Sequence, residues 1–486
     1  MGADRVQIDV DELMQQISED VANRPFIPLP QPLISDVPAE PPIQAPVQIN
    51  RPPLSKRIKG RSKRYLFAIV HQLKQVKSRV RQFLSAKKHK VKAILRPTKN
   101  AVLPPVEADL PPTQLIERSS VIHIAILTPC LVDGDAVGND VIGMYRVLTQ
   151  QGYYCEIFAE AWSTTEVDVK HISQVKAFLT KPSDVLIYHY SIGWDLGLAP
   201  LQELDCKKVI KYHNVTPPEY YEDFNEDYAN VCRAGRAQLL PIAKIQNATY
   251  LSDSVYNASE LHQLGVHPQN SAVLPPFHYI DRLQFTEPDF SVLDAYRDGK
   301  FNILMVGRLV PNKGHAALIE AFNVYHRTYN ANSRLLIVGK SDPRLYKYND
   351  FLQEKVKSLE LTHAVVFTGG VSAAALKSYY LASNVFMITS DHEGFCVPLI
   401  EAMSIKLPIV ASASTAIPMT VGKAGLVWSQ PDPALLAGAL HCIATSETIS
   451  HQLGELGWQR YQEVFTNRRI EAEFLELIER LTAGQK

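Results

Sequence analysis

The stretch EGFCVPLIE carries two glutamates, Glu393 and Glu401, on either side of a proline that suits the first turn of a helix. Carboxylates are good hydrogen-bond acceptors for vicinal hydroxyls, such as those of a sugar or a ribose. The N–H groups around Phe395–Val397 would be unpaired at the helix start and available to a phosphate oxygen. The alternative is a surface loop whose glutamate only complements the helix dipole. If both carboxylates face the same crevice, the segment binds hydroxyls and phosphates together.

A second polar segment, GRLVPNKG, holds Arg308 and Lys313 directly after an apolar run that is typical of a strand. Two such cations can converge on an anion such as a diphosphate, Arg through its planar fork and Lys as a point charge. Gly307 lets the backbone approach a ligand closely. A solvated basic loop is the alternative, and the segment taken alone favours neither interpretation.

The segment YHNVTPP places His213 at the end of a further predicted strand, before a Thr-Pro-Pro turn. A lone histidine is more often structural than catalytic. His213 becomes a candidate catalytic residue because we expect it to face the loops that carry Arg308 and Glu393.

A glycine-containing loop, DGDAVGND, lies between the first predicted strand and an apolar helix, and includes Gly134 and Gly138. It lacks the GxGxxG pattern of dinucleotide-binding proteins, which weakens a dehydrogenase interpretation. Its Asp133-Gly134-Asp135 imitates a metal-binding DxD motif, but any Asp-Gly-Asp turn has the same form. We therefore predict no metal site here.

Short β-rich runs alternate with helical stretches from about residue 120, which is typical of βαβ units in a parallel sheet. Ligands of doubly wound folds bind outside the carboxyl ends of the strands, which is where the four loops lie. Two series, separated by a linker near Pro275-Pro276, predict two tandem doubly wound domains. The predicted strands are 122–127, 155–158, 185–189, 208–212, 302–306, 335–338, 365–367, 385–388 and 409–411.

Together these loops resemble those of the retaining GT-B glycosyltransferases of family GT4, also called glycosyl transferases group 1. The resemblance covers roughly residues 120–465 and is most specific in EGFCVPLIEAM, with GRLVPNKG and YHNVTPP before it in order. It implies an α/β GT-B fold, in which two Rossmann-like domains face a central cleft. It also implies a nucleotide-sugar donor as substrate.

The resemblance implies a role for each matching residue. Arg308 and Lys313 would bind the diphosphate of the donor, and Glu401 the ribose. Glu393 would contact hydroxyls of the transferred sugar, with His213 beside the anomeric centre. The remaining donor-binding positions are Gly394, Phe395, Cys396 and Val397, together with Gly138 in the loop that would line the cleft. Because these cations and N–H groups supply the positive field, we expect no metal and no cofactor.

Two positions depart from the commonest family pattern. Cys396 stands where a glycine is frequent, so thiol reagents are expected to inhibit. Lys406 stands where a glycine often ends the helix, and a positive φ there would cost about 1 kcal/mol. Neither change removes a charged group, so we predict an active enzyme.

The chain of 486 residues has a formal net charge of zero, with 50 basic and 50 acidic residues. Residues 51–100 hold 17 Lys and Arg and no Asp or Glu. The six cysteines lie far apart without a CxxC pair, which favours a reducing compartment. No apolar run approaches the roughly 20 residues that span a bilayer, so we expect a cytoplasmic protein.

The basic segment has an apolar stripe at steps of three and four, which predicts an amphipathic helix. Lys and Arg opposite that stripe favour an anionic membrane surface at the inner face of the cell membrane. A short coiled coil with a partner is an alternative. We expect no nucleic acid as a partner, because no base-stacking module accompanies the charge.

These observations predict six regions. An acidic start with a Pro-rich linker, mostly disordered, covers 1–54, and the basic helix covers 55–96. After a linker over 97–119, the acceptor-side domain covers 120–283 and the nucleotide-sugar domain 284–465. A C-terminal helix covers 466–486.

The predicted function is sugar transfer from a UDP- or GDP-sugar to a glycan or lipid-linked acceptor, in surface polysaccharide or glycolipid assembly. The alternatives are an epimerase, a sucrose-type synthase, or a noncatalytic scaffold that binds nucleotide sugars.

Overall fold

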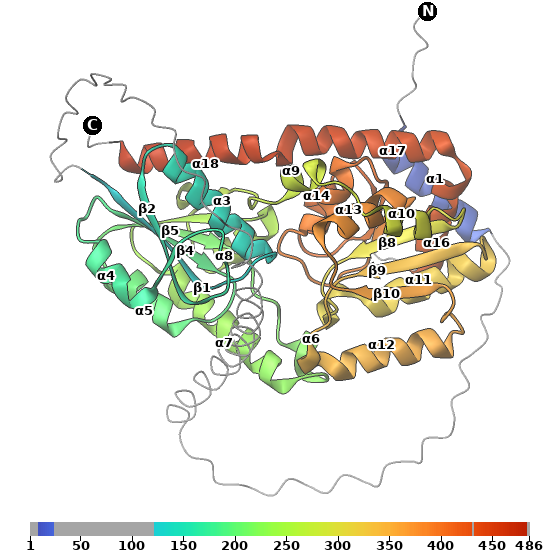
Figure 1. The fold of residues 1–486 in the computed structure, drawn as a ribbon, viewed down its shortest axis with the longest axis horizontal. Helices are drawn as coiled ribbons and strands as arrows, with labels where there is room; N and C mark the ends of the chain where they lie inside the picture. The colour runs from blue at the N-terminus through green and yellow to red at the C-terminus, as the bar shows by residue number, and fades with distance from the viewer. Residues whose placement is uncertain (1–7, 24–120, 430–431, 484–486) are drawn as a thin grey trace, which may run out of the picture. The chain divides into compact units, whose positions relative to one another are not determined.

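The computed structural model describes residues 8–23, 121–429 and 432–483. Within them lie two parallel sheets, each covered by helices on both faces (Figure 1). The first sheet has the strand order β3-β2-β1-β4-β5-β6-β7, and every neighbouring pair is parallel. Its strands are β1 His123–Leu131, β2 Tyr154–Trp162, β3 Val169–His171, β4 Val185–Tyr190, β5 Lys207–Tyr212, β6 Ala248–Ser252 and β7 Ser271–Val273.

The second sheet has the order β10-β9-β8-β11-β12-β13, and it is also parallel throughout. Its strands are β8 Phe301–Val306, β9 Ser333–Val338, β10 Val365–Gly369, β11 Val385–Ile388, β12 Ile409–Ser412 and β13 Leu426–Trp428. In each sheet the first and fourth strands in sequence are neighbours, β1 beside β4 and β8 beside β11. The strand order runs in opposite directions on the two sides of this pair. These are the two Rossmann-like domains of the predicted GT-B fold, which the structure confirms.

The connections between parallel strands carry the helices, as the crossover rule requires. Those of the first domain are α3 Ala136–Gln150, α4 Val175–Phe178, α5 Asp195–Glu203, α6 Glu219–Glu222, α7 Glu226–Ala243 and α8 Val255–Gln263. Those after β7 are α9 Ile280–Phe285, α10 Phe290–Tyr296, α11 His315–Thr328, α12 Tyr346–Ser358, α13 Ala373–Ala382, α14 Val397–Ser404, α15 Ile417–Val421, α16 Pro433–Thr445, α17 Glu447–Arg460 and α18 Asn467–Thr482.

All nine strands expected from the sequence are present, most of them one to four residues longer. The strands that the sequence pattern missed are β3, β6, β7 and β13. β3, β7 and β13 have three residues each, and β6 contains Thr249 and Ser252, so the apolar run of each strand is too short to stand out.

The C-terminal helix α18 packs on the first domain, although it follows the second in the sequence (Figure 1). Ile470, Phe474 and Ile478 are buried in the core that also contains residues of α3 and β1. The expected boundary near residue 465 is thus the point where the chain crosses back. The predicted C-terminal helix is present as α18, and its buried face completes the core of the first domain.

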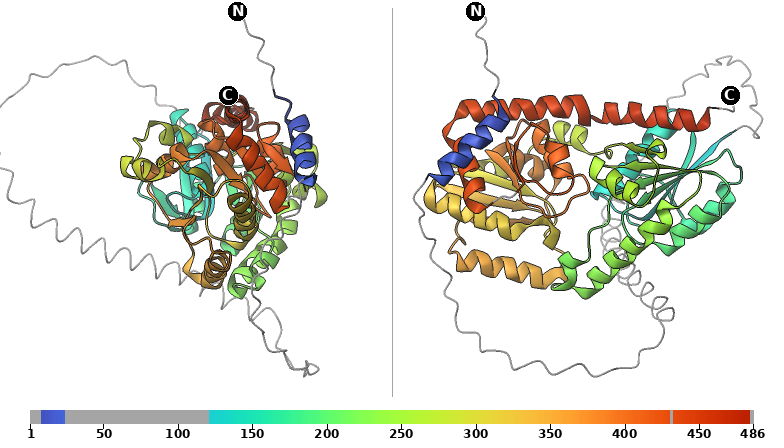
Figure 2. Two further views of the ribbon diagram at one scale, coloured as in Figure 1. Left: turned by 90° about the vertical axis from the view of Figure 1, so that its right-hand side faces the viewer. Right: turned by 180° about the vertical axis from the view of Figure 1, so that it is seen from behind.

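Part of the acidic start forms a helix, α1 Val10–Ala22. Asp9 caps it by accepting hydrogen bonds from the N–H groups of Asp11 and Glu12. Val10, Leu13 and Ile17 are buried in the core of the second domain, where α1 lies against α16 (Figure 2). Residues 10–22 are therefore part of the second domain.

The predicted basic helix of residues 55–96 and the linkers on either side of it lie outside the described residues. None of the helices that the structure describes is long and apolar enough to cross a membrane.

Candidate functional site

Two glycines allow the loop after β8 to lie directly against the ends of the neighbouring strands β9 and β11. Gly314 has φ +63°, and a Cβ there would lie 1.9 Å from the carbonyl oxygen of Thr389. The backbone at Gly339 is equally close to this loop, because a Cβ added there would lie 1.7 Å from the carbonyl oxygen of Gly307. Only glycine fits at such distances, so the backbone of this loop is fixed beside the ends of β9 and β11.

Lys313 and Glu393 meet at this edge of the sheet. Nζ of Lys313 donates to both carboxylate oxygens of Glu393, at 2.6 and 2.8 Å. The hydroxyl of Ser390 donates to the same carboxylate at 2.7 Å. The N–H of Glu393 in turn donates to Oγ1 of Thr415 at 2.8 Å, which holds the backbone. The two expected ligand-binding residues therefore form one largely buried, preorganised pair.

The start of α14 offers unpaired backbone donors, as the sequence predicted. Cys396 is the residue before the helix and has φ +75°, and Pro398 follows in the first turn. In the described part of the chain, the N–H groups of Phe395, Cys396 and Val397 have no hydrogen-bond acceptor. Such donors at a helix N-terminus suit an anion.

Glu401 lies further along α14, and its carboxylate accepts a hydrogen bond from the hydroxyl of Tyr380 at 2.6 Å. Burial raises the pKa of this carboxyl, and the bond from Tyr380 only partly offsets the effect. No direct contact joins Glu401 to Glu393 among the described residues. The Cys396 thiol interacts electrostatically with both carboxylates.

Cys396 is buried, and burial raises the pKa of its thiol well above the ordinary value, with Glu393 adding to the effect. A protonated, covered thiol is a poor nucleophile. The burial of this thiol therefore argues against the expected inhibition by thiol reagents. Lys406 keeps the left-handed conformation expected of it, with φ +61°.

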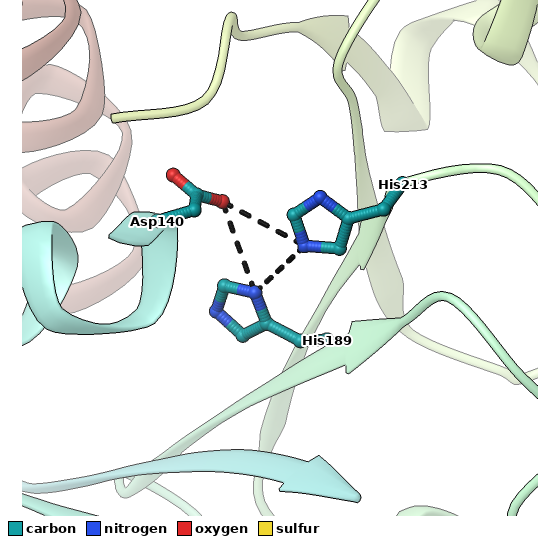
Figure 3. Close-up of side chains that lie close together, drawn as sticks. All are labelled: Asp140, His189 and His213. Carbon is teal, nitrogen blue, oxygen red and sulfur yellow. Dashed lines mark hydrogen bonds and ion pairs between the residues drawn. The ribbon is translucent and has the colours of Figure 1, made fainter. Parts of the chain in front are cut away.

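His213 follows β5 and belongs to a buried polar cluster, drawn in Figure 3. Its Nδ1 lies 2.8 Å from Oδ2 of Asp253, and its Nε2 lies 2.8 Å from Nδ1 of His189. Oδ2 of Asp140 lies 3.7 Å from Nε2 of His213. The ring is therefore held on both sides, and its side chain is only 5 % exposed.

Lys211 supplies a cation to the same cluster. Its Nζ lies 2.7 Å from Oδ1 of Asp253 and 3.9 Å from Oδ2 of Asp140. Burial would raise the pKa of Asp253, but His213 and Lys211 hold it below the ordinary value. Burial raises the pKa of Asp140, and it keeps the pKa of the His189 ring well below its ordinary value. Atoms of Asp140, His189 and His213 lie close enough together to share one metal ion.

The loops of the two domains meet directly. A Cβ at Gly394 would lie 2.6 Å from the carbonyl oxygen of His213. Next to it, Nε2 of His392 lies 2.8 Å from Oδ1 of Asn214. The hydroxyl of Tyr221 donates to Oδ1 of Asn312 at 3.1 Å. The expected apposition of His213 with the EGFCVPLIE loop is thus present.

The remaining predicted residues are placed differently. Arg308 is exposed, forms no ion pair with any described residue, and interacts electrostatically with Cys232 of α7. Gly138 is buried in the first turn of α3, where its N–H donates to Asp135 and a Cβ would lie 2.8 Å from the carbonyl oxygen of Val132. Gly138 therefore serves the packing of the loop.

Sequence reasoning missed most of the cluster around His213. His189 ends a strand that was predicted, so its place at the sheet edge could have been inferred. Asp253 follows β6, which was not predicted, and Lys211 lies inside a strand, so neither carried a recognisable signal. Asp140 ends the segment DGDAVGND, in which sequence reasoning assigned it no role of its own.

Comparison with known proteins agrees with this fold and these loops. Residues 294–459 match the family model of glycosyl transferases group 1. A curated relative, mannosylfructose-phosphate synthase of Agrobacterium fabrum, is 28 % identical over 232 residues, which are 45 % of this chain and 50 % of that protein. The chain spans at most about half the length of the first curated relatives it matches.

Two solved structures share the fold over nearly their whole length. Sucrose-phosphate synthase from Thermosynechococcus elongatus has a TM-score of 0.61 at 20 % identity, covering 74 % of this chain and 99 % of that one. Anabaena Alr3699/HepE in complex with UDP-glucose has a TM-score of 0.59 at 15 % identity, with the same coverage. The match of residues 294–459 makes the second domain similar to the glycosyl transferases group 1, and the chain as a whole has the GT-B fold.

Proposed function

We propose that this protein is a retaining glycosyltransferase that moves a sugar from a nucleotide-diphosphate sugar to an acceptor. The observation that carries the proposal is the meeting of three groups at one place: the Lys313–Glu393 pair, the unpaired N–H groups at the start of α14, and the His213 loop. A cation, free amide donors and a carboxylate are the groups that a diphosphate and a sugar need.

The chemistry follows from where charge develops. When the glycosidic C–O bond breaks, negative charge builds on the leaving diphosphate. Lys313, Arg308 and the N–H groups of Phe395–Val397 would stabilise this charge more than they stabilise the ground state. These groups supply a positive field by themselves, so transfer is proposed to proceed without a metal or cofactor.

The carboxylates would bind hydroxyls. Glu393 would contact the transferred sugar, and Ser390 and Thr415 already hold it in place. Glu401 would bind the ribose, exchanging its bond from Tyr380 or sharing it. His213 would lie beside the anomeric centre, because its carbonyl oxygen approaches Gly394.

The solved Alr3699/HepE complex supports a UDP-sugar, and we propose UDP or GDP as the donor nucleotide. The proposed acceptor is a glycan or a lipid-linked saccharide in surface polysaccharide or glycolipid assembly. We place the protein in the cytoplasm, with residues 55–96 at the inner face of the membrane or against a coiled-coil partner.

A second candidate function is synthesis of a disaccharide phosphate from a small sugar phosphate. The names of two similar proteins, mannosylfructose-phosphate synthase and sucrose-phosphate synthase, favour this alternative. Both activities would use the same donor groups and differ only in the acceptor, so product analysis with each acceptor class separates them.

The test is a panel of UDP- and GDP-sugars, read first by thermal shift and then by hydrolysis and transfer. A true donor at a hundred times its Kd should stabilise the chain by about 2.7 kcal/mol. Turnover that Glu393→Ala abolishes supports the proposal. Binding without turnover would instead indicate a noncatalytic scaffold, and turnover without an acceptor to an isomeric nucleotide sugar would indicate an epimerase. If wild type and Glu393→Ala are equally inactive on the whole panel, the proposal fails.

A further inference from the structure

The cluster in Figure 3 brings side chains from three separate elements to one point. Asp140 comes from α3, His189 from β4, and His213 from the loop after β5. Nδ1 of His189 and Nε2 of His213 lie 3.8 and 3.7 Å from Oδ2 of Asp140. The two ring nitrogens lie 2.8 Å apart. All three side chains are at least nine-tenths buried.

Asp140 is oriented but incompletely satisfied. Its Oδ1 accepts a hydrogen bond from the N–H of Phe277 at 2.8 Å, which fixes the carboxylate plane. Its Oδ2 points at the two rings and has no hydrogen-bond donor among the residues that the structure describes. A buried carboxylate oxygen without a donor is costly, on the order of a few kcal/mol. The position therefore suits a cation that would bind this oxygen.

We propose that Asp140, His189 and His213 bind one divalent transition-metal ion of the Zn²⁺ class. The three interatomic distances define a point roughly 2 Å from all three atoms, which is the length of a Zn–N or Zn–O bond. Two imidazole nitrogens and one carboxylate oxygen are ligands that Zn²⁺ accepts. Three protein ligands leave a fourth position for water.

The surroundings of His213 match those of a metal-binding histidine. Oδ2 of Asp253 lies 2.8 Å from its Nδ1 and would hold that nitrogen as the N–H donor. The other nitrogen, Nε2, is then directed at Asp140 and His189 with a free lone pair. A carboxylate behind a ligating imidazole is the usual arrangement in zinc sites, because it fixes the tautomer and the ring orientation.

The charged groups around the proposed metal position carry a net negative charge, which favours binding of a cation. Asp140 and Asp253 bring two carboxylates, against one ammonium from Lys211. That ammonium is engaged by Asp253 at 2.7 Å and by the carbonyl oxygen of Leu274, and it lies 3.9 Å from Oδ2 of Asp140. The direct hydrogen bond between the two rings is the competing state, since one proton between them also satisfies both nitrogens. The ion would have to displace this proton.

The proposed metal site shares His213 with the proposed transfer site, but its occupancy can be tested separately from transfer. Arg308 and Lys313 belong to the second domain, whereas all three ligands belong to the first. Binding is measured directly, so failure of the transferase proposal would leave the metal proposal standing, and the reverse also holds.

The experiment uses the untagged full chain after treatment with a chelator. Zn²⁺ is titrated by calorimetry, and Co²⁺ is added separately to record its visible absorption. We expect one ion per chain and the intense absorption of four-coordinate cobalt. His189→Ala and Asp140→Asn should abolish stoichiometric binding, and Asp253→Asn should weaken it about 10- to 100-fold. The control is His262→Ala, at an exposed histidine of α8 that should leave binding unchanged.

X-ray absorption of the Zn²⁺-loaded wild-type chain identifies the metal ligands without any variant. It therefore tests the proposal even if a variant fails to fold. Nitrogen and oxygen ligands at about 2.0–2.2 Å with imidazole scattering are expected. The proposal is overturned if the wild type binds no stoichiometric ion, if the spectrum lacks imidazole, or if folded His189→Ala and Asp140→Asn bind Zn²⁺ as the wild type does.

Discussion

Lys313 and Glu393 are 80 residues apart in sequence, and Nζ of Lys313 donates to both carboxylate oxygens of Glu393. The pair is largely buried, with side chains 17 % and 7 % exposed. Each residue therefore holds the other in place before a donor arrives. A diphosphate would bind the ammonium, and the freed carboxylate oxygen would accept from a sugar hydroxyl.

We expect Lys313→Met and Glu393→Gln each to reduce kcat/KM about 10²- to 10³-fold, because the first removes a cation from the leaving diphosphate and the second weakens the acceptor for the sugar hydroxyls. The double variant should be little worse than either single variant, since the residues act as one unit. Lys355→Met is a matched control: Lys355 pairs with Glu320 in the same domain, away from the site. Additive losses would contradict the shared role.

The close approach of Gly394 to His213 predicts a strong effect of one methyl group. In Gly394→Ala the new Cβ would lie 2.6 Å from the carbonyl oxygen of His213, so the two loops must separate. A displacement of this size should lower kcat/KM about a hundredfold, measured on the donor found by the panel. Gly457→Ala in α17, where a Cβ meets only ordinary contacts of 3.4 Å or more, should be nearly neutral. Equal activities of the two variants would show that the approach has no role in catalysis.

Cys396 should resist alkylation in the folded protein, because its thiol is buried and its pKa is raised well above the ordinary value. Iodoacetamide at pH 8, followed by peptide mass spectrometry, checks this residue by residue. The same protein unfolded in urea is the control, in which Cys396 should react fully. Rapid native labelling at Cys396 would restore the expectation of inhibition by thiol reagents.

The helix α1 should stabilise the second domain. Ile17→Ala removes a side chain that is 4 % exposed, and such truncations cost about 2–5 kcal/mol in unfolding free energy. Gly438→Val tests the same contact from α16, because a Cβ there would lie 2.6 Å from Val21. Urea denaturation measures both variants. Asp11→Asn on the exposed face of α1 should change stability by less than about 0.5 kcal/mol. A neutral Ile17→Ala would mean that α1 does not remain docked in solution.

The buried His315 should make stability depend on pH. Burial lowers the pKa of its ring to about 3, and Lys313 adds to the effect, so the folded state keeps the ring neutral. The unfolded chain takes up a proton as pH falls below about 6.5. Stability is therefore full above pH 6.5 and falls between pH 6.5 and 3, by about 1.4 kcal/mol per pH unit from this residue.

The measurement is the unfolding free energy of the wild type and of His315→Gln between pH 7 and pH 4. The variant should be less stable at pH 7 but lose stability less steeply on acidification. His262→Gln, at an exposed histidine, should keep the slope of the wild type. Identical slopes in all three proteins would contradict the assignment to His315.

The sequence by itself determined the two parallel sheets and the loops that matter. Strands such as β8 and β11 are nearly continuous apolar runs, because both faces of a parallel sheet are covered, and this pattern is local. The carboxyl ends of such strands must share an edge. Lys313, Glu393 and the start of α14 could therefore be assigned to one site without knowing a single contact.

Only the tertiary structure decided which partners these residues take. The Lys313–Glu393 pair, the buried cluster of Asp140, His189 and His213, and the return of α18 to the first domain each join residues remote in the chain. Such contacts depend on side-chain direction and close packing, which residue type and spacing do not encode. For the same reason the sequence did not reveal that Gly138 packs closely against the carbonyl oxygen of Val132.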